Sequence, residues 1–214
     1  MAADLSEVRS EYRQAALRES EMDPDPIRQF ERWFNHALES KLDMPNAMVL
    51  ATAGKDGRPS ARYVLLKKFD ASGFVFYSHS MSLKGLQMAE NPRAALAFYW
   101  APQHRQVRVE GAVEVVPAAD AEEYFKSRPY GSRLSVWVAP QSSMVETREY
   151  LERRIVELDG QFHDGEVPRP ESWVGYRVRP ESIEFWQGRE NRLHDRILYL
   201  CESGGRWTIK RLAP

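Results

Sequence analysis

The chain has 214 residues, which is enough for one sizeable domain with its own hydrophobic core. Hydrophobic residues make up 43% and charged residues 29%, and the formal net charge is -1. This composition is that of an ordinary globular protein and lacks the basic excess of a general nucleic-acid binder. The single cysteine, Cys201, excludes an internal disulfide framework and a cysteine-based metal site. The N-terminus lacks a secretory apolar region and no apolar run approaches the roughly 18 residues of a membrane span, so we expect a cytoplasmic protein.

Two helices are expected near the start of the chain. Over residues 4–19, Leu5, Val8 and Tyr12 recur at helical spacing with charged residues between them. Asp25 is a suitable N-cap for a second helix, with Pro26 at its first position. The apolar face of that helix is formed by Ile27, Phe30, Trp33, Phe34, Ala37 and Leu38.

Short strands separated by turn residues dominate the rest of the sequence. Strand patterns cover residues 47–53, 61–69, 73–78, 93–100, 105–116, 174–180, 182–187, 196–202 and 206–212. Helices are expected over 82–91, with Ser82 as cap, and over 118–128 and 144–162. About eight short strands with helices inserted between them predict a mainly β protein with α additions, built as a closed or partly closed antiparallel barrel. Strands and helices do not alternate regularly, which argues against a doubly wound parallel sheet.

Several common catalytic motifs are missing from the sequence. It contains no G-x-G-x-x-G after a strand and no G-x-x-x-x-G-K-[ST], so a Rossmann dinucleotide site and a P-loop lose support. The histidines show no H-E-x-x-H spacing, and no G-x-S-x-G elbow is present. We therefore expect no metal site.

The segment 183–196, IEFWQGRENRLHDR, is the most informative part of the sequence. Arg192, His194 and Arg196 alternate, and in an extended chain alternate side chains share one face. Two guanidinium groups and an imidazole on one face would make an anion-binding surface. The alternative is a solvated strand edge with scattered charges.

A second basic cluster lies between residues 62 and 84 and has two parts. Arg62 and Lys67, with Lys68 beside them, are five residues apart, so a shared role requires a bulge or a strand end between them. Ser82 and Lys84 open a short helix, and such an N-terminus suits phosphate, although capping without a ligand is the commoner use of the serine.

A third cluster is formed by Tyr124, Arg128 and Ser132, which are each four residues apart. Helical spacing would place them on one face, but Pro129 indicates that the helix ends there. An ordinary helix C-terminus with its basic residue is the alternative. Together the clusters predict a protein that binds phosphorylated small molecules.

These segments together resemble the pyridoxamine 5'-phosphate oxidase family. The likeness runs from about Arg9 to the terminal RLAP, and EFWQGRENRLHDR is similar to the family signature. RYVLLK, RQVRVEG, YFKSRP and APQSS follow the family's order and approximate spacing.

The resemblance implies a split-barrel homodimer with two FMN sites at the subunit interface. It implies oxidation of pyridoxamine 5'-phosphate and pyridoxine 5'-phosphate by O2 to pyridoxal 5'-phosphate and H2O2. The cofactor-binding positions that match the family are Arg62, Tyr63, Val64, Leu65, Leu66, Lys67, Tyr77, Ser78, Lys84, Gln106, Gln141, Ser142, Trp186 and Arg196. The substrate-binding positions are Arg9, Tyr12, Lys67, Tyr124, Arg128, Ser132, Arg192 and His194, and Arg192 with His194 would lie over the pyridine ring as the catalytic pair. Residues 1–22 would form an N-terminal segment that closes over the site, and residues 23–214 the FMN-binding barrel with its C-terminal dimerisation region.

One position departs from the family pattern. The family usually has S-R-K where this chain has Ser82, Leu83 and Lys84, so Leu83 replaces an arginine that normally helps to hold the FMN phosphate. Loss of one charge-assisted hydrogen bond costs roughly 1.5–3 kcal/mol. We therefore predict weaker FMN binding than is usual.

Three other functions remain open. The nearest is a related split-barrel flavoenzyme with another substrate, such as a phenazine-pathway oxidase. The second is a carrier that binds FMN or pyridoxal phosphate without turnover, which Leu83 would favour, and the third is a structural interaction protein that binds no flavin. Lys67, Tyr124, Arg128 and Ser132 favour the phosphorylated B6 substrate over the first of these, and all three rank below the oxidase.

Overall fold

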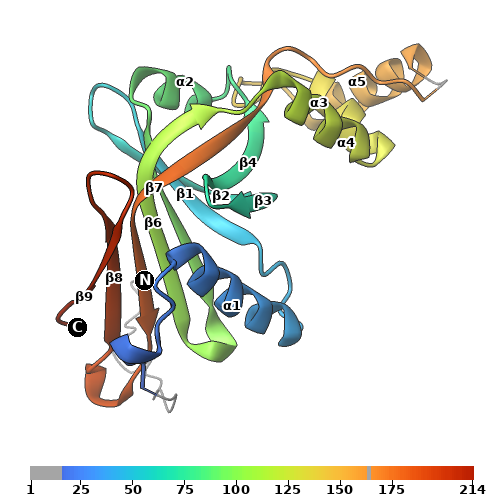
Figure 1. Ribbon diagram of the computed structural model, residues 1–214. Helices are drawn as coiled ribbons and strands as arrows, with labels where there is room; N and C mark the ends of the chain where they lie inside the picture. The colour runs from blue at the N-terminus through green and yellow to red at the C-terminus, as the bar shows by residue number, and fades with distance from the viewer. Residues whose placement is uncertain (1–15, 163–164) are drawn as a thin grey trace, which may run out of the picture.

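The computed structural model describes residues 16–162 and 165–214, and its centre is one antiparallel sheet (Figure 1). The described residues form nine strands in the order β2-β1-β5-β6-β7-β4-β3, with β8 paired to β7 and β9 to β8. The strands are β1 Ala47–Ala53, β2 Pro59–Leu65, β3 Lys68–Asp70, β4 Gly73–His79, β5 Arg93–Trp100, β6 Arg105–Val115, β7 Trp173–Gln187, β8 Asp195–Cys201 and β9 Trp207–Arg211. The sheet curves strongly, which agrees with the predicted mainly β, antiparallel architecture.

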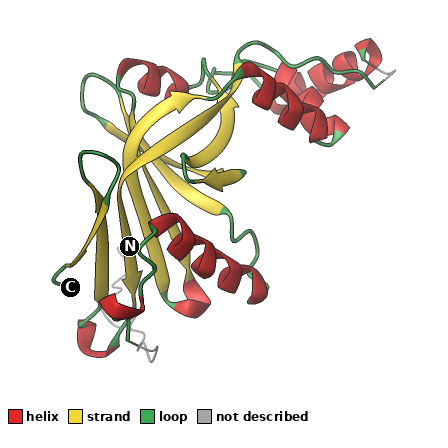
Figure 2. Ribbon diagram, viewed as in Figure 1, coloured by secondary structure: helices red, strands yellow, loops and turns green. Residues whose placement is uncertain are grey.

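Helices lie at both ends of this sheet (Figure 2). The α-helices are α1 Pro26–Glu39, α2 Leu83–Glu90, α3 Ala118–Ser127, α4 Tyr130–Leu134 and α5 Arg148–Gln161. Short 3-10 turns cover η1 Glu19–Glu21, η2 Ala101–Gln103, η3 Ser135–Trp137 and η4 Glu190–Arg192. The helix predicted over residues 4–19 falls mostly outside the described residues. No helix in the described ranges is long and apolar enough to cross a membrane.

Helix α1 begins where its sequence predicts. Asp25 Oδ1 accepts a hydrogen bond from the Ile27 N–H at 2.8 Å, so the expected N-cap is confirmed. The apolar face then packs onto the sheet, where the fully buried Phe30 ring meets Phe74 edge-on at 4.9 Å and Phe98 at 5.1 Å. These aromatic contacts form the main core on the concave side of the sheet.

The strand predicted over residues 61–69 is two strands, not one. β2 ends at Leu65, and β3 starts at Lys68 on the opposite edge of the sheet. Between them the Leu66 N–H donates to the Asn46 carbonyl at 2.9 Å, and the Lys67 N–H donates to the Val75 carbonyl at 2.8 Å. The chain therefore crosses from one sheet edge to the other within two residues.

The two strands predicted over 174–180 and 182–187 are one long strand, β7. Pro180 does not end it, because the β6–β7 register shifts between Glu110 and Gly111, directly opposite this proline. The irregularity absorbs the missing N–H of Pro180 without breaking the strand.

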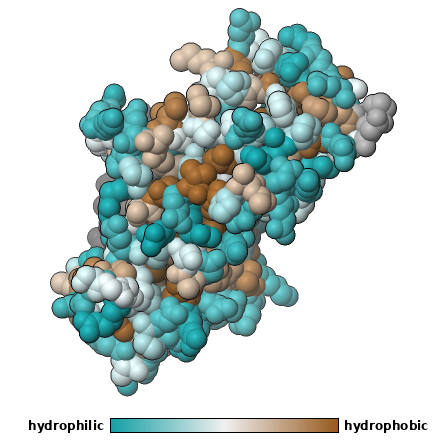
Figure 3. Space-filling view, turned by 45° about the horizontal axis from the view of Figure 1, so that its top comes forward, coloured by the Kyte–Doolittle hydropathy of each residue, from teal (hydrophilic) through white to brown (hydrophobic). Residues whose placement is uncertain are grey.

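A helical arm made of α3, α4 and α5 projects from one end of the sheet, at the upper right of Figure 1. It has its own small core, formed by Phe125, Leu134, Val136, Leu158, Val167 and Trp173. Figure 3 shows apolar surface in the hollow between this arm and the body of the sheet. Sequence patterns predicted α3 and α5 but not α4, which is only five residues long.

Candidate functional site

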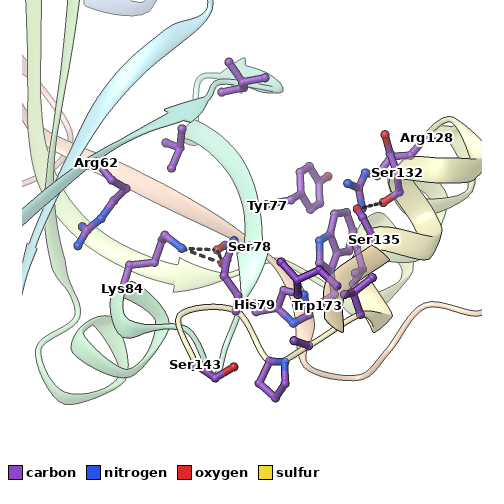
Figure 4. A pocket seen from close by; sticks show the side chains of 18 of the residues that line it. Arg62, Tyr77, Ser78, His79, Lys84, Arg128, Ser132, Ser135, Ser143 and Trp173 are labelled. Atoms are coloured by element: carbon purple, nitrogen blue, oxygen red, sulfur yellow. Dashed lines mark hydrogen bonds between the residues drawn. The ribbon is translucent and has the colours of Figure 1, made fainter. Parts of the chain in front are cut away.

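A cavity of about 1240 Å³ lies between the helical arm and the strand edges of β2 and β4. This exceeds the roughly 300–1,000 Å³ of a typical small-molecule site, so it has room for two ligands. It is lined by most of the residues that the family resemblance assigns to the cofactor or the substrate. These are Arg62, Tyr63, Val64, Leu65, Lys67, Tyr77, Ser78, Lys84, Tyr124, Arg128, Ser132 and Gln141. Figure 4 shows several of them facing one another across the cavity.

The strand end between β2 and β3 explains how Arg62 and Lys67 reach the same cavity. Both residues line it although they are five apart, as the sequence required if they were to share a role. Leu66, between them, is 4% exposed and packs into the core instead. The predicted contact of Leu66 with a cofactor remains a prediction.

Lys84 lies at the start of α2, at one end of the cavity. Its Nζ donates to Ser78 Oγ at 3.0 Å, Ser82 Oγ at 3.2 Å and Gln141 Oε1 at 2.8 Å, all of them neutral acceptors. Burial, and then the charge of Arg62, lower the pKa of Lys84 to about 8. The ammonium is therefore buried without a carboxylate among these partners, and an anion would stabilise it.

Arg62 supplies the second cation at this end. Its Nη1 donates to the Leu50 carbonyl at 3.1 Å and to Thr52 Oγ1 at 2.6 Å, and its Nη2 donates to Ser60 Oγ at 2.6 Å. Burial lowers the pKa of the Arg62 guanidinium. Neutral oxygens thus fix the direction of this guanidinium, and no carboxylate of residues 16–162 or 165–214 forms an ion pair with it, which suits phosphate.

Serine hydroxyls cap the first turn of α2 at this cationic end. Ser82 Oγ accepts from the Gly85 N–H at 3.3 Å, which confirms the expected cap. The Leu83 N–H donates to Ser142 Oγ at 3.3 Å, so the APQSS loop, which also carries Gln141, sits on the helix N-terminus. Ser142 has a φ of 75°, a left-handed conformation that this docked loop holds in place.

Arg128 marks the other end of the cavity. Its Nη1 is buried and has no hydrogen-bond partner among the described residues, and burial lowers its pKa. Tyr124 and Ser132 line the cavity with it, and Lys67 Nζ lies 5.9 Å from the centre of the Tyr124 ring. An unpartnered guanidinium nitrogen in a cavity that Lys67 also lines is suited to bind an anion.

Sequence reasoning missed several side chains that shape this cavity. His79 lines it, and burial, followed by the charges of Lys84 and Arg128, lowers its pKa. Thr52, which orients Arg62, lies on β1 and carries no motif of its own. The alternation along β4 could have found His79, since Tyr77 and His79 lie two residues apart on one strand.

The remaining predicted residues form a second cluster on β6, β7 and β8. Gln106 is directly opposite Trp186, and Trp186 is directly opposite Arg196, so the three share one face of the sheet. The Trp186 ring lies 4.7 Å from the His194 ring. Arg196 is held by the buried carboxylate of Glu184, with Nε to Oε1 at 2.7 Å and Nη2 to Oε2 at 3.1 Å.

The extended alternation expected for Arg192, His194 and Arg196 is wrong. Asn191 and Arg192 have φ angles of 55° and 62°, within the turn η4, and β8 begins only at Asp195. His194 is placed by a hydrogen bond from the Arg189 N–H to its Nδ1 at 3.1 Å, so a neutral imidazole carries its proton on Nε2. Burial, and then the charge of Arg192, lower the pKa of His194, which favours this neutral form.

The two clusters are separate within one chain. None of Gln106, Trp186, Arg192, His194 and Arg196 lines the cavity. In Figure 1 the orange-red turn η4 lies at the bottom of the sheet, whereas α3 and α4 lie at the top. Arg9 and Tyr12 lie outside the described residues, so their predicted roles are not addressed by this geometry.

Comparison with known proteins gives one consistent family. Residues 34–162 match the family model described as pyridoxamine 5'-phosphate oxidase, and residues 173–214 match the pyridoxine 5'-phosphate oxidase C-terminal dimerisation region. The chain belongs to the pyridoxamine 5'-phosphate oxidase family. It is 56% identical over 211 residues to a pyridoxine/pyridoxamine 5'-phosphate oxidase of Rubrobacter xylanophilus, which covers 99% of this chain and 97% of that one. A Cyanothece relative of the same name is 50% identical over all 214 residues and 100% of its own length.

Solved structures of this family share the fold. PhzG of Burkholderia lata, in complex with tetrahydrophenazine-1-carboxylic acid, matches with a TM-score of 0.87 and 29% identity over 94% of this chain and 99% of its own. A pyridoxamine 5'-phosphate oxidase-related, FMN-binding protein of Nostoc punctiforme matches with a TM-score of 0.71 at 18% identity over 90% of this chain and 100% of its own. The predicted split-barrel fold is thereby confirmed.

Proposed function

We propose that this protein uses FMN to oxidise pyridoxamine 5'-phosphate and pyridoxine 5'-phosphate to pyridoxal 5'-phosphate. The alcohol and O2 give the aldehyde and H2O2, while the amine, O2 and water give the aldehyde, ammonia and H2O2. The observation that carries the proposal is a single cavity with two cationic ends, Arg62 with Lys84 and Lys67 with Arg128. Two phosphates are present when a flavin mononucleotide and a phosphorylated vitamer bind together, one for each end.

The residues at the α2 end fit the phosphate of FMN. Lys84 and Arg62 have only neutral partners in the hydrogen bonds described above, and Lys84 lies in the first turn of α2. Ser78 and Gln141 share the Lys84 ammonium and add side-chain dipoles. Bound FMN would supply the two-electron acceptor that the protein itself lacks.

The residues at the arm end fit the phosphate of the substrate. The buried, unpartnered Nη1 of Arg128 would gain an acceptor, and Lys67 and Ser132 would add further donors. Arg192 and His194 would orient the pyridine ring and its C4' group, which is mainly an effect of positioning. The neutral His194, with its proton on Nε2, would donate a hydrogen bond to the substrate rather than take a proton through that atom.

A second copy of the chain would complete each site. Gln106, Trp186, Arg192, His194 and Arg196 lie outside the cavity of their own chain, although the family assigns all five to the same pair of ligands. A two-fold dimer would bring this cluster from one subunit over the cavity of the other. The match of residues 173–214 to a dimerisation region supports this arrangement.

The N-terminal segment would close over the completed site. The Leu17 N–H donates to Asp195 Oδ2 at 3.0 Å, and Arg211 Nη2 donates to the Leu17 carbonyl at 2.7 Å. Asp195 directly follows His194, so the base of residues 1–22 is tied beside the proposed ring clamp. We assign the protein to the cytoplasm, in keeping with its exposed free Cys201.

The phenazine-pathway alternative is the second candidate, because PhzG shares this fold at 29% identity. The cavity argues for the vitamer, since Lys67, Tyr124, Arg128 and Ser132 together form an anion seat at the arm end. The curated relatives at 50% and 56% identity carry the vitamer oxidase name.

The direct test follows pyridoxal 5'-phosphate formation in air from purified protein, FMN and pyridoxine 5'-phosphate. We expect product that depends on both additions, with H2O2 formed in equal amount. Flavin binding without product would favour a different substrate or a carrier. Failure to bind flavin would contradict the proposal altogether.

Mixing two inactive chains tests the shared site. Lys84→Met should disable the cavity, and Arg192→Ala should disable the clamp. Subunit exchange between them would give one intact site in each mixed dimer, so about a quarter of wild-type activity should return. No recovery, with exchange demonstrated by differently tagged chains, would mean that both clusters act within one subunit.

A further inference from the structure

Three aromatic rings lie nearly parallel and close to one another in the wall of the cavity, with the Tyr124 and Trp173 rings 6.0 Å apart at 11°. The Tyr77 and Tyr124 rings are 4.2 Å apart with an interplanar angle of 20°, and the Tyr77 and Trp173 rings are 5.1 Å apart with an angle of 9°. Tyr77 is a predicted cofactor residue and Tyr124 a predicted substrate residue, whereas Trp173 has no assigned role. All three line the cavity.

Two cations lie against these rings, one at Trp173 and one at Tyr124. The Arg128 guanidinium carbon lies 5.0 Å from the centre of the Trp173 ring, and Lys67 Nζ lies 5.9 Å from the centre of the Tyr124 ring. A guanidinium over an indole face is attracted by the ring quadrupole, most strongly when water is excluded. Trp173 is 5% exposed, so this contact is shielded from water.

The backbone and the ring of Trp173 are both held by neighbouring residues. It is the first residue of β7 and pairs with His79 of β4. Its backbone N–H donates to the Pro170 carbonyl at 3.0 Å, and its backbone carbonyl accepts from Arg169 Nη1 at 2.7 Å. The Phe125 ring meets its indole edge-on at 5.1 Å. The indole is therefore a rigid surface, whereas Arg128 Nη1 has no hydrogen bond of its own to hold it.

We infer that Trp173 is a positioning residue that holds Arg128, through the face of its indole, at the place where the substrate phosphate binds. This inference rests on the proposed oxidase function for the identity of the phosphate, but the contact between Trp173 and Arg128 does not depend on it. Without Trp173, Arg128 would keep only the more distant Phe125 ring, 5.8 Å from its guanidinium carbon, and the ligand would have to order it at a cost in affinity.

The test compares FMN-loaded wild-type protein with Trp173→Leu, Trp173→Phe and a control, Trp137→Leu. Trp137 belongs to the same helical arm, where it packs on Phe162 and donates to the Pro168 carbonyl, but it does not line the cavity. We expect Trp173→Leu to raise the KM for pyridoxine 5'-phosphate about tenfold, with a much smaller change in kcat. Trp173→Phe, which keeps an aromatic face, should restore most of the loss, and Trp137→Leu should leave KM unchanged.

A double-mutant cycle with Arg128→Ala separates positioning from general destabilisation. If Trp173 acts through Arg128, adding Trp173→Leu to Arg128→Ala should change KM by less than about twofold. Additive effects, or an equal rise in KM for Trp137→Leu, would overturn the inference.

Inorganic phosphate supplies a readout that does not need turnover. Its affinity for the FMN-loaded protein, followed by 31P NMR, should fall in Trp173→Leu and in Arg128→Ala alike. If wild-type protein did not oxidise the vitamer, the proposed function would fail, yet this titration would still support or refute the role of Trp173. Unchanged phosphate affinity in Trp173→Leu would refute it.

Discussion

Replacing Leu83 by arginine tests whether this chain binds FMN more weakly than the family pattern allows. Leu83 is the first residue of α2, it is 52% exposed, and it directly precedes Lys84. A charge-assisted hydrogen bond to phosphate is worth roughly 1.5–3 kcal/mol, and half exposure places the gain near the lower figure. About 1.5 kcal/mol corresponds to roughly tenfold tighter FMN binding. The new cation at the helix N-terminus would also reduce the stability of α2 by about 0.3 kcal/mol or more.

The assay is a titration of FMN fluorescence against protein, with Leu86→Arg as the matched control. Leu86 lies one turn further along the same helix and is 45% exposed, so arginine there adds the same charge away from the phosphate seat. We expect Leu83→Arg to bind FMN about tenfold more tightly than wild type and Leu86→Arg to show only a small gain that salt removes. Equal affinities for the two variants would refute the reasoning, since the gain would then be general electrostatic attraction.

Three further predictions concern the site and the core. Arg192→Ala should lose turnover far more than FMN affinity, since the family resemblance assigns Arg192 to the substrate and not to the cofactor; a fluorescence titration beside the oxidase assay checks this, and unchanged turnover would contradict it. Burial and the charge of Arg62 lower the pKa of Lys84 to about 8, so the positive charge of Lys84 is present below that pH and is lost above it. FMN affinity should therefore fall as the pH rises through 8. Lys84→Arg should abolish this pH dependence. Phe30→Ala should reduce the free energy of unfolding by about 3–5 kcal/mol in urea, because the ring is fully buried among Phe74 and Phe98; a loss below about 1 kcal/mol would mean that the site collapses around the gap.

Local signals in the sequence located the elements whose ends are capped. Asp25 starts α1 and Ser82 starts α2, as their side-chain oxygens predict. Residues 47–53 form β1 with the expected bounds, because their alternation is set by one buried face. Such features depend on neighbours within a few residues and can be read from the chain alone.

Features set by distant contacts could not be read in this way. The end of β2 at Leu65 depends on which sheet edge the next residues join, and the continuity of β7 through Pro180 depends on the register of β6. The left-handed Arg192 is likewise fixed by its turn, so alternation along the sequence gave the wrong geometry there. Sequence resemblance nevertheless named twelve of the residues that line the cavity, because it draws on complete sites rather than on local spacing.

The pairing of β4 with β7 constrains the order in which the protein can fold. The β1–β2 hairpin forms from neighbouring residues, but β4, which carries Tyr77 and Ser78, pairs with β7 about one hundred residues later, Phe74 with Val178. Pairings this distant in sequence slow folding, because the long intervening loop must close before they contribute. During synthesis β4 therefore has only β3 beside it until the chain through residue 178 of β7 has emerged. Cofactor binding then becomes a late event in the life of each new chain.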